Sequence, residues 1–200
     1  MFILVNLPKS KRINLLIVML FVLFSSGCVS SFDPAKALSS DEGIALARVH
    51  LSGEVPKVTF VTYNKNKILD PHGFRGEGAS TLAPITMPAG EHSFDKAVYM
   101  QGIELIEPDI SCVGEFNVEA GKITYVGDIY FHTGDYDNYV VFSSYPYKIT
   151  LRDNMDSTMK ALFRQYPSLK GKYDIGKSLA GPFICQDEQR ESKAQLPQVN

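Results

Sequence analysis

The residues of this sequence that could perform acid–base chemistry are few and widely spaced. Asp70 and His72 stand two positions apart in the segment Asp70-Pro-His72-Gly, and an aspartate that orients a histidine makes a general base if a nucleophile lies within hydrogen-bond reach. The sequence has no G-x-S-x-G elbow to supply that nucleophile. His50, His92 and His132 occur singly, without the spacing of zinc ligands. We therefore expect His72 to be a solvated loop residue, the other histidines to be structural, and the protein not to be an enzyme.

A hydrolase remains the alternative, with a site that the fold would assemble from distant residues. Its candidates are Asp70, His72, Asp128, His132 and Asp135. This alternative requires two or three of them to converge in a pocket beside a nucleophile.

A cluster of oxygen-bearing side chains follows His132. The run Asp135-Tyr-Asp137-Asn138 could present several oxygens to a hard cation such as calcium. Calcium needs six to eight ligands, and the calcium-loop pattern is absent, whereas Gly, Asp and Asn are ordinary turn residues. We expect a solvated turn here, and no metal or cofactor.

Aromatic side chains concentrate in one stretch. Six of the ten tyrosines lie between positions 125 and 147. Tyrosine combines a flat apolar ring with a hydroxyl group, which suits contacts with sugars or peptides. We take Tyr130, Tyr136 and Tyr139 as a possible binding face, and strand propensity with rings on both faces as the alternative.

The N-terminal residues have the parts of an export signal. A basic stretch from Lys9 to Arg12 precedes the apolar run Leu15–Phe24, and Ser25-Ser-Gly-Cys28 follows at once. The ten apolar residues of that run would rise about 15 Å as a helix, half of the roughly 30 Å hydrocarbon layer. We predict a cleaved signal peptide over residues 1–27 rather than an uncleaved membrane anchor.

The four residues ending at Cys28 resemble the lipobox of bacterial lipoproteins. The resemblance implies a thioether-linked diacylglycerol on Cys28, cleavage before it, and acylation of the new amine, for example with palmitate. Two acyl chains already anchor a protein stably. Val29 stands where enterobacterial lipoproteins kept in the inner membrane have Asp, which implies the outer membrane, facing the periplasm, in a cell with two membranes. Plain secretion is the alternative.

The residues after the anchor are rich in Ser, Asp and Ala. We predict that residues 28–43 form the lipidated cysteine and a flexible tether with a reach of about 20 Å.

Cys112 and Cys185 are the two other cysteines. Two thiols in an exported protein form an oxidisable pair, and no C-x-x-C pattern suggests a metal site. We predict a disulfide between them, against the alternative of two separate buried thiols.

Segments in which side chains alternate between two faces, as in β-strands, dominate the body of the chain. Ala45, Ala47, Val49 and Leu51 share one predicted strand face, while Arg48 and His50 share the other. The predicted strands are Ile44–Leu51, Val58–Tyr63, Ile123–Phe131, Tyr139–Phe142 and Tyr147–Leu151. Short strands at this spacing predict a mainly β protein, with a β-sandwich over residues 44–185.

Two Ala-Gly turns are more specific. Pro88-Ala-Gly-Glu-His92 and Ala120-Gly-Lys-Ile-Thr-Tyr125 each separate apolar runs, and their glycines allow the positive φ of a tight hairpin. The pattern resembles the hairpins of PEGA-like domains, over roughly residues 44–131. The resemblance implies a sandwich of the PEGA or transthyretin type on the periplasmic side of a membrane, and implies no catalytic residues.

One amphipathic helix is predicted near residues 153–166. Asp153 or Asn154 can cap it, and Pro167 ends it. Its apolar stripe is formed by Met155, Met159, Leu162, Phe163 and Tyr166. We expect this stripe to cover the sheet rather than to bind membrane or a partner. Residues 186–200 are polar and predict a disordered tail.

The charge balance narrows the classes of partner. The chain has 20 Lys and Arg residues against 22 Asp and Glu residues, and three of the basic ones lie in the predicted signal. The remaining acidic body argues against nucleic acid. The sequence thus predicts a lipid-anchored envelope protein with a non-catalytic binding or structural role, whose partner is another envelope protein or peptidoglycan.

Overall fold

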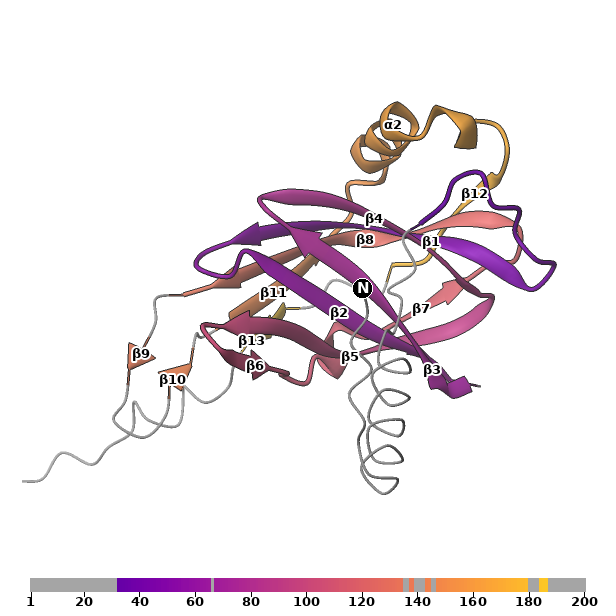
Figure 1. The fold of residues 1–200 in the computed structure, drawn as a ribbon. Coiled ribbons are helices and arrows are strands. Elements are labelled where there is room, and N and C mark those ends of the chain that lie inside the picture. The colour runs from indigo at the N-terminus through magenta and orange to yellow at the C-terminus, as the bar shows by residue number, and fades with distance from the viewer. Residues whose placement is uncertain are drawn as a thin grey trace, which may run out of the picture. The chain divides into compact units, whose positions relative to one another are not determined.

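Two stacked sheets and one α-helix form most of the described part of the chain (Figure 1). The structure is a computed structural model that describes residues 32–65, 67–134, 137–138, 143–144, 147–179 and 184–186. Most of these residues lie in strands, and the one α-helix comes late in the chain. The predicted mainly β, sandwich-like fold is confirmed.

The first sheet has the order β13-β11-β8-β1-β4, and β12 also pairs with β8. β1 runs parallel to β8, whereas β4 pairs antiparallel with β1 and β11 antiparallel with β8. The bounds of these strands are β1 Glu42–Ser52, β4 Ser80–Pro88, β8 Lys122–Thr133, β11 Tyr147–Arg152, β12 Asp174–Lys177 and β13 Ile184–Gln186.

The second sheet has the order β3-β2-β5-β6, and β7 also pairs with β5. Its strands are β2 Lys57–Asn64, β3 Lys67–Glu77, β5 Gly90–Gln101, β6 Glu104–Ile106 and β7 Glu115–Val118. A 3-10 turn, η1 (Ser111–Val113), precedes β7, and two short strands, β9 (Asp137–Asn138) and β10 (Ser143–Ser144), pair with each other.

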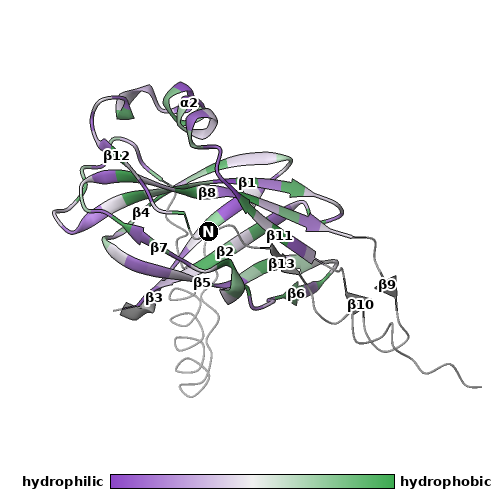
Figure 2. Cartoon of the chain, turned by 180° about the vertical axis from the view of Figure 1, so that it is seen from behind, coloured by the Kyte–Doolittle hydropathy of each residue, from purple (hydrophilic) through white to green (hydrophobic). Residues whose placement is uncertain are grey.

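The main core lies between the two sheets. Hydrophobic and hydrophilic residues alternate along the strands (Figure 2), and Ala45, Ala47, Val49 and Leu51 of β1 all point into this core, as predicted. Phe60 of β2 meets Phe131 of β8 across the sandwich, with ring centroids 5.8 Å apart. Burial of each such ring contributes about 1.5–3 kcal/mol to folding.

The α-helix α2 (Met155–Gln165) covers the outside of the first sheet. Its Met159 and Leu162 are buried against Ile44, Leu46 and Tyr125 in a second, smaller core. The predicted apolar stripe therefore covers the sheet, as expected. The backbone N–H of Met155 donates to Oδ1 of Asp153, one of the two predicted capping residues. No helix among the described residues is long and apolar enough to cross a bilayer.

A β-bulge interrupts β8 at Val126 and Gly127. Leu46 of β1 pairs with Tyr125, but the next residue, Ala47, pairs with Gly127. The extra residue reverses the alternation, because one added residue moves all later side chains to the opposite face. Tyr125 before the bulge and Asp128 after it therefore both lie on the outer face, although three positions separate them.

The two Ala-Gly turns do not form hairpins, so that prediction was wrong. Gly90 and Gly121 have the expected positive φ of 124° and 68°. Pro88-Ala-Gly90, however, connects β4 of the first sheet to β5 of the second, and Ala120-Gly121 lies between β7 and β8, again in different sheets. Local turn chemistry predicts the reversal of the chain but not whether the two strands pair.

The segment around Asp70-Pro-His72 is a strand and not the turn-rich loop predicted. Pro71 lies in β3, an edge strand of the second sheet, opposite Tyr63 of β2. An edge strand tolerates proline, because proline lacks only the N–H that would have bonded to a further strand. His72 is accordingly not a solvated loop residue, since its side chain is 17% exposed.

The predicted tether lies on the body from Phe32 onward. Phe32 makes an edge-on contact with Tyr166, with ring centroids 5.4 Å apart, and Leu38 packs against the second core. Two residues of the predicted tether over residues 28–43, Phe32 and Leu38, therefore contact the body. The predicted strand Tyr139–Phe142 and the predicted tail after Gln186 fall outside the described residues.

Candidate binding face

Three strands of the first sheet present polar side chains on the side facing away from the second sheet. Residues paired across neighbouring strands share one face and lie side by side. The register of β1, β8 and β11 produces three rows: Arg48 with Asp128 and Arg152, His50 with Tyr130 and Thr150, and Ser52 with His132 and Lys148. We call these nine residues the outer polar face.

Asp128 is the centre of this face and is only 1% exposed. Its Oδ1 accepts hydrogen bonds from the hydroxyl of Tyr125 at 2.9 Å and from that of Thr158 at 2.7 Å. Its Oδ2 lies 3.0 Å from Nε2 of His50 and accepts from Nδ2 of Asn154 at 3.3 Å. Four donors from β1, β8 and the start of α2 thus compensate the burial of one carboxylate.

Tyr125 stays protonated at all physiological pH values. Burial raises the pKa of its hydroxyl far above the ordinary value, and the neighbouring Asp128 carboxylate raises that pKa further. The Tyr125 hydroxyl therefore donates to Asp128, while it accepts the backbone N–H of Asn154 at 2.9 Å. These two hydrogen bonds of the Tyr125 hydroxyl join the start of α2 to the sheet.

His50 and Tyr130 are held as a stacked pair. Their ring centroids are 4.3 Å apart and their planes differ by 5°. Because a carboxylate only accepts, Nε2 of His50 carries the hydrogen directed at Asp128. The guanidinium of Arg152 lies 5.0 Å from the centroid of the Tyr130 ring, and the Tyr130 hydroxyl accepts from Asn154 at 3.1 Å. Tyr130 is therefore pre-positioned, with its ring half-buried.

The face has an excess of positive charge. Arg48, Lys148 and Arg152 are cationic, and Lys148 and Arg152 are exposed. Asp128 is the one carboxylate of the nine residues, and its oxygens are occupied. A ligand would therefore meet cations and an aromatic ring on this face.

Ser52 and His132 form a separate pair at the end of the same face. Oγ of Ser52 lies 2.9 Å from Nδ1 of His132. The hydrogen bonds of Asp128 described above include His50 but neither member of this pair. Carboxylate, imidazole and hydroxyl are thus divided between two pairs and do not form a relay among the described residues.

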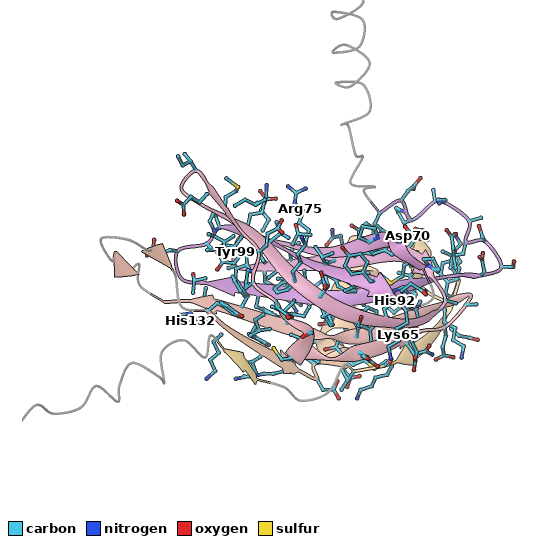
Figure 3. The ribbon with its side chains drawn as sticks, turned by 90° about the horizontal axis from the view of Figure 1, so that it is seen from below. Lys65, Asp70, Arg75, His92, Tyr99 and His132 are labelled. Carbon is cyan, nitrogen blue, oxygen red and sulfur yellow. The ribbon has the colours of Figure 1, made fainter. Side chains whose placement is uncertain are left out.

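The four described candidates for a hydrolase site do not converge. Asp70 and His72 lie in the second sheet, and Figure 3 shows Asp70 and His92 toward the end of the sandwich opposite His132. Asp128 and His132 share the outer polar face but contact different partners. Asp135 falls outside the described residues.

His72 contributes instead to a buried cluster with His92. The two ring centroids are 6.1 Å apart, and His92 stacks on Phe116 at 5.5 Å. Burial lowers the pKa of His92, and the neighbouring His72 lowers it further. Nε2 of His92 lies 2.8 Å from the carbonyl oxygen of Pro88 and 3.3 Å from Nδ2 of Asn64. Among the described residues, Nδ1 of His92 and Nε2 of His72 have no hydrogen-bond partner, although Nε2 of His72 lies 3.5 Å from Oδ2 of Asp70.

Several predicted positions cannot be placed on this face. Tyr136, Tyr139 and Cys28 fall outside the described residues, so of the predicted tyrosine face only Tyr130 is located. Asp137 and Asn138 of the possible cation loop form β9. Within the described part of the chain, no three acidic, histidine or cysteine side chains gather as a metal site.

A hollow of about 500 Å³ lies on the outside of the second sheet. Val98, Met100 and Leu105 line it, and Met100 and Leu105 are exposed. Lys57 and Glu77 at its rim form an ion pair at 3.2 Å. This hollow therefore offers apolar surface without a preference for the sign of a ligand's charge.

Comparisons with protein-family models, characterised proteins and solved structures find no match to this chain. The functional assignment accordingly depends on the geometry of the chain's own residues.

Sequence reasoning missed all four partners of Asp128, Tyr125 among them. His50 was correctly placed opposite the core face of its strand, but nothing indicated its contact with Asp128. Asn154 was considered only as a cap, and Thr158 was not considered. One signal was present: an isolated glycine within an apolar strand, here Gly127, is a mark of a bulge. It would have placed Asp128, Tyr130 and His132 on one outward face.

Proposed function

We propose that this protein is a lipid-anchored envelope protein that uses the outer polar face as a non-catalytic binding surface. The observation that carries the proposal is the fixed arrangement of Tyr130 between His50 and Arg152. A pre-positioned aromatic ring beside a guanidinium group binds with little loss of side-chain entropy. The excess of exposed positive charge favours a ligand with acidic groups, and peptidoglycan is the envelope polymer we propose.

Cys28 is the proposed site of the lipid anchor. Phe32 is packed on the body, and only Val29–Ser31 separate it from Cys28. Four residue steps of at most about 3.5 Å give a reach of about 14 Å. A lipid on Cys28 would hold the domain directly against the bilayer, in the outer membrane of a two-membrane cell.

A disulfide between Cys112 and Cys185 belongs to the same proposal. The elements that carry them, η1 and β13, are in contact, and Cys112 is not a free thiol. Such a bond would close a loop of 73 positions, which the chain-entropy estimate values at about 4 kcal/mol. Alkylation of both cysteines without reductant, detected by mass spectrometry, would contradict the pairing.

Retention on isolated peptidoglycan sacculi tests the binding face. We expect the full-length chain in detergent to sediment with sacculi, and Tyr130→Ala to lose most of this retention. Tyr63→Ala is the matched control, because Tyr63 is a half-buried tyrosine of β2 in the other sheet. Equal retention of wild type and Tyr130→Ala would contradict the proposal.

A hydrolase is the second candidate, and the contact between Ser52 and His132 is the observation that favours it. A serine hydroxyl 2.9 Å from an imidazole nitrogen has the geometry of a nucleophile with its base. Treatment with a fluorophosphonate tests this reading. Covalent labelling of Ser52 that His132→Ala abolishes would support the hydrolase, and no labelling would leave the binding module as the better assignment.

A further inference from the structure

A pocket of about 290 Å³ opens between α2 and the first sheet, beside the outer polar face. β1 and β4 supply one wall and the last turns of α2 supply the other. Its lining consists of Arg48, Ser80, Leu82, Ala161, Arg164 and Gln165. Arg48 belongs to both the pocket and the outer polar face, so the two are continuous.

Two guanidinium groups line this pocket without a carboxylate partner. Nε of Arg48 donates to Oγ of Ser80 at 2.9 Å, which is a neutral acceptor. In the described ranges, the arginine ion pair that occurs joins Arg75 to Glu77 on the second sheet. The pocket therefore holds two positive charges that no carboxylate of the described chain neutralises.

The end of α2 opposes these charges only weakly. The carboxyl end of a helix carries about half a negative elementary charge, against the two full positive charges of Arg48 and Arg164. The net field in the pocket is therefore positive, and it selects an anion.

We propose that this pocket binds the terminal carboxylate of a peptide that ends in a small residue such as alanine. A guanidinium presents parallel N–H groups that match the two oxygens of a carboxylate. Leu82 and Ala161 supply an apolar wall for a methyl group, while Ser80 and Gln165 offer hydrogen-bonding groups to a peptide amide. This assignment rests on the proposed function, because it places the acidic group of the ligand at the edge of the same face.

Two sources could provide such a carboxylate: the D-alanine end of a peptidoglycan stem peptide, or the L-residue end of a protein chain. Calorimetric titration of the full-length protein in detergent with acetyl-Ala-Ala distinguishes them. The D,D and L,L peptides are each compared as free acid and as C-terminal amide. We expect the D,D acid to bind most tightly and its amide at least about tenfold more weakly, as loss of a charge-assisted hydrogen bond predicts.

Arg48→Gln and Arg164→Gln are each expected to weaken binding of the acid about tenfold or more. Arg164 is exposed on α2, so its replacement leaves the cores intact. Arg75→Gln, on the second sheet, is the matched control and should bind like wild type. Tighter binding of the L,L acid would keep the carboxylate site but identify a protein terminus as its source.

Equal binding of acid and amide would overturn the proposal. Binding of inorganic phosphate but not of either peptide acid would also overturn it. Because the titration does not involve sacculi, its result is distinguishable from that of the experiment that measures retention on sacculi. Acid binding without retention on sacculi would preserve the pocket and refute the peptidoglycan role.

Discussion

At the scale of residues, one buried carboxylate organises the outer polar face. Asp128 fixes His50, Tyr125 and Thr158 through direct hydrogen bonds. A buried charge costs several kcal/mol unless donors surround it. The donors also depend on the carboxylate: the buried hydroxyl of Thr158 would lose its acceptor, and Tyr125 would keep only its longer contact of 3.3 Å with the carbonyl oxygen of Arg152.

Asp128→Ala should therefore destabilise the fold by at least about 3 kcal/mol, since several buried donors lose their acceptor together. Urea denaturation measures this change in the free energy of unfolding. Asp174→Ala provides the control, because Asp174 is an exposed carboxylate of β12, and should change stability by less than about 0.5 kcal/mol. Similar effects of the two substitutions would refute the central role of Asp128.

The buried histidine cluster predicts a pH dependence. Burial and His72 lower the pKa of His92 below its ordinary value, with Asp70 acting in the opposite direction. The unfolded chain therefore binds a proton at a higher pH than the folded chain. Stability should fall as the pH decreases from the unfolded pKa of about 6.5 to the lower folded pKa, and level off below it.

His92→Gln should flatten this dependence, because an amide keeps a donor near the Pro88 carbonyl but does not titrate. Urea midpoints at pH 7.5 and pH 5.5 provide the comparison. An unchanged difference between the two midpoints in the variant would show that other groups cause the pH dependence.

At the scale of elements, the strands were more predictable than their connections. Alternation in β1 placed Ala45, Val49 and Arg48 on the correct faces, because the period of a strand is fixed by its backbone. The Ala-Gly turns and β3 were misjudged, since local residues do not encode which strand becomes the neighbour. Pro71 suits an edge strand as well as a turn, and only the tertiary structure decides between them.

The bulge in β8 is the element on which the candidate site depends. Gly127 has a φ of 131°, and a Cβ at this position would lie 2.9 Å from Cγ of Leu151. Gly127→Ala should therefore cost about 2 kcal/mol or more, through backbone strain and overpacking combined. Gly121→Ala is the control, because Gly121 also has a positive φ, of 68°, but has open space around its Cβ position.

We expect Gly121→Ala to cost only about 1 kcal/mol, from the left-handed backbone alone. Thermal or urea unfolding of both variants measures the difference. A Gly127→Ala protein no less stable than Gly121→Ala would mean that Leu151 yields easily and that the bulge is not fixed by this contact.

At the scale of the whole molecule, the outer polar face and the Arg48 pocket lie on the same side of the first sheet as α2. Phe32, where the described chain begins, packs against Tyr166 just beyond the end of that helix. A lipid on Cys28 would therefore leave only Val29–Ser31 between the bilayer and the helix layer. The proposed lipid anchor would therefore be joined by only a few residues to the side of the first sheet that carries the proposed binding surface. A connection this short favours ligands close to the membrane.

Cys28→Ser tests this arrangement, because a serine hydroxyl cannot accept the thioether-linked diacylglycerol. We expect the variant to move from the membrane fraction to the soluble envelope fraction, while Cys112→Ser stays with the membrane. Each buried methylene of an acyl chain contributes about 0.8 kcal/mol, so loss of the lipid removes nearly all of the binding energy that the proposal assigns to the bilayer. A Cys28→Ser protein that still sediments with membranes after a high-salt wash would show that another surface holds the protein there. The exposed residues Met100, Ile103 and Leu105 on the second sheet would then be the first to replace.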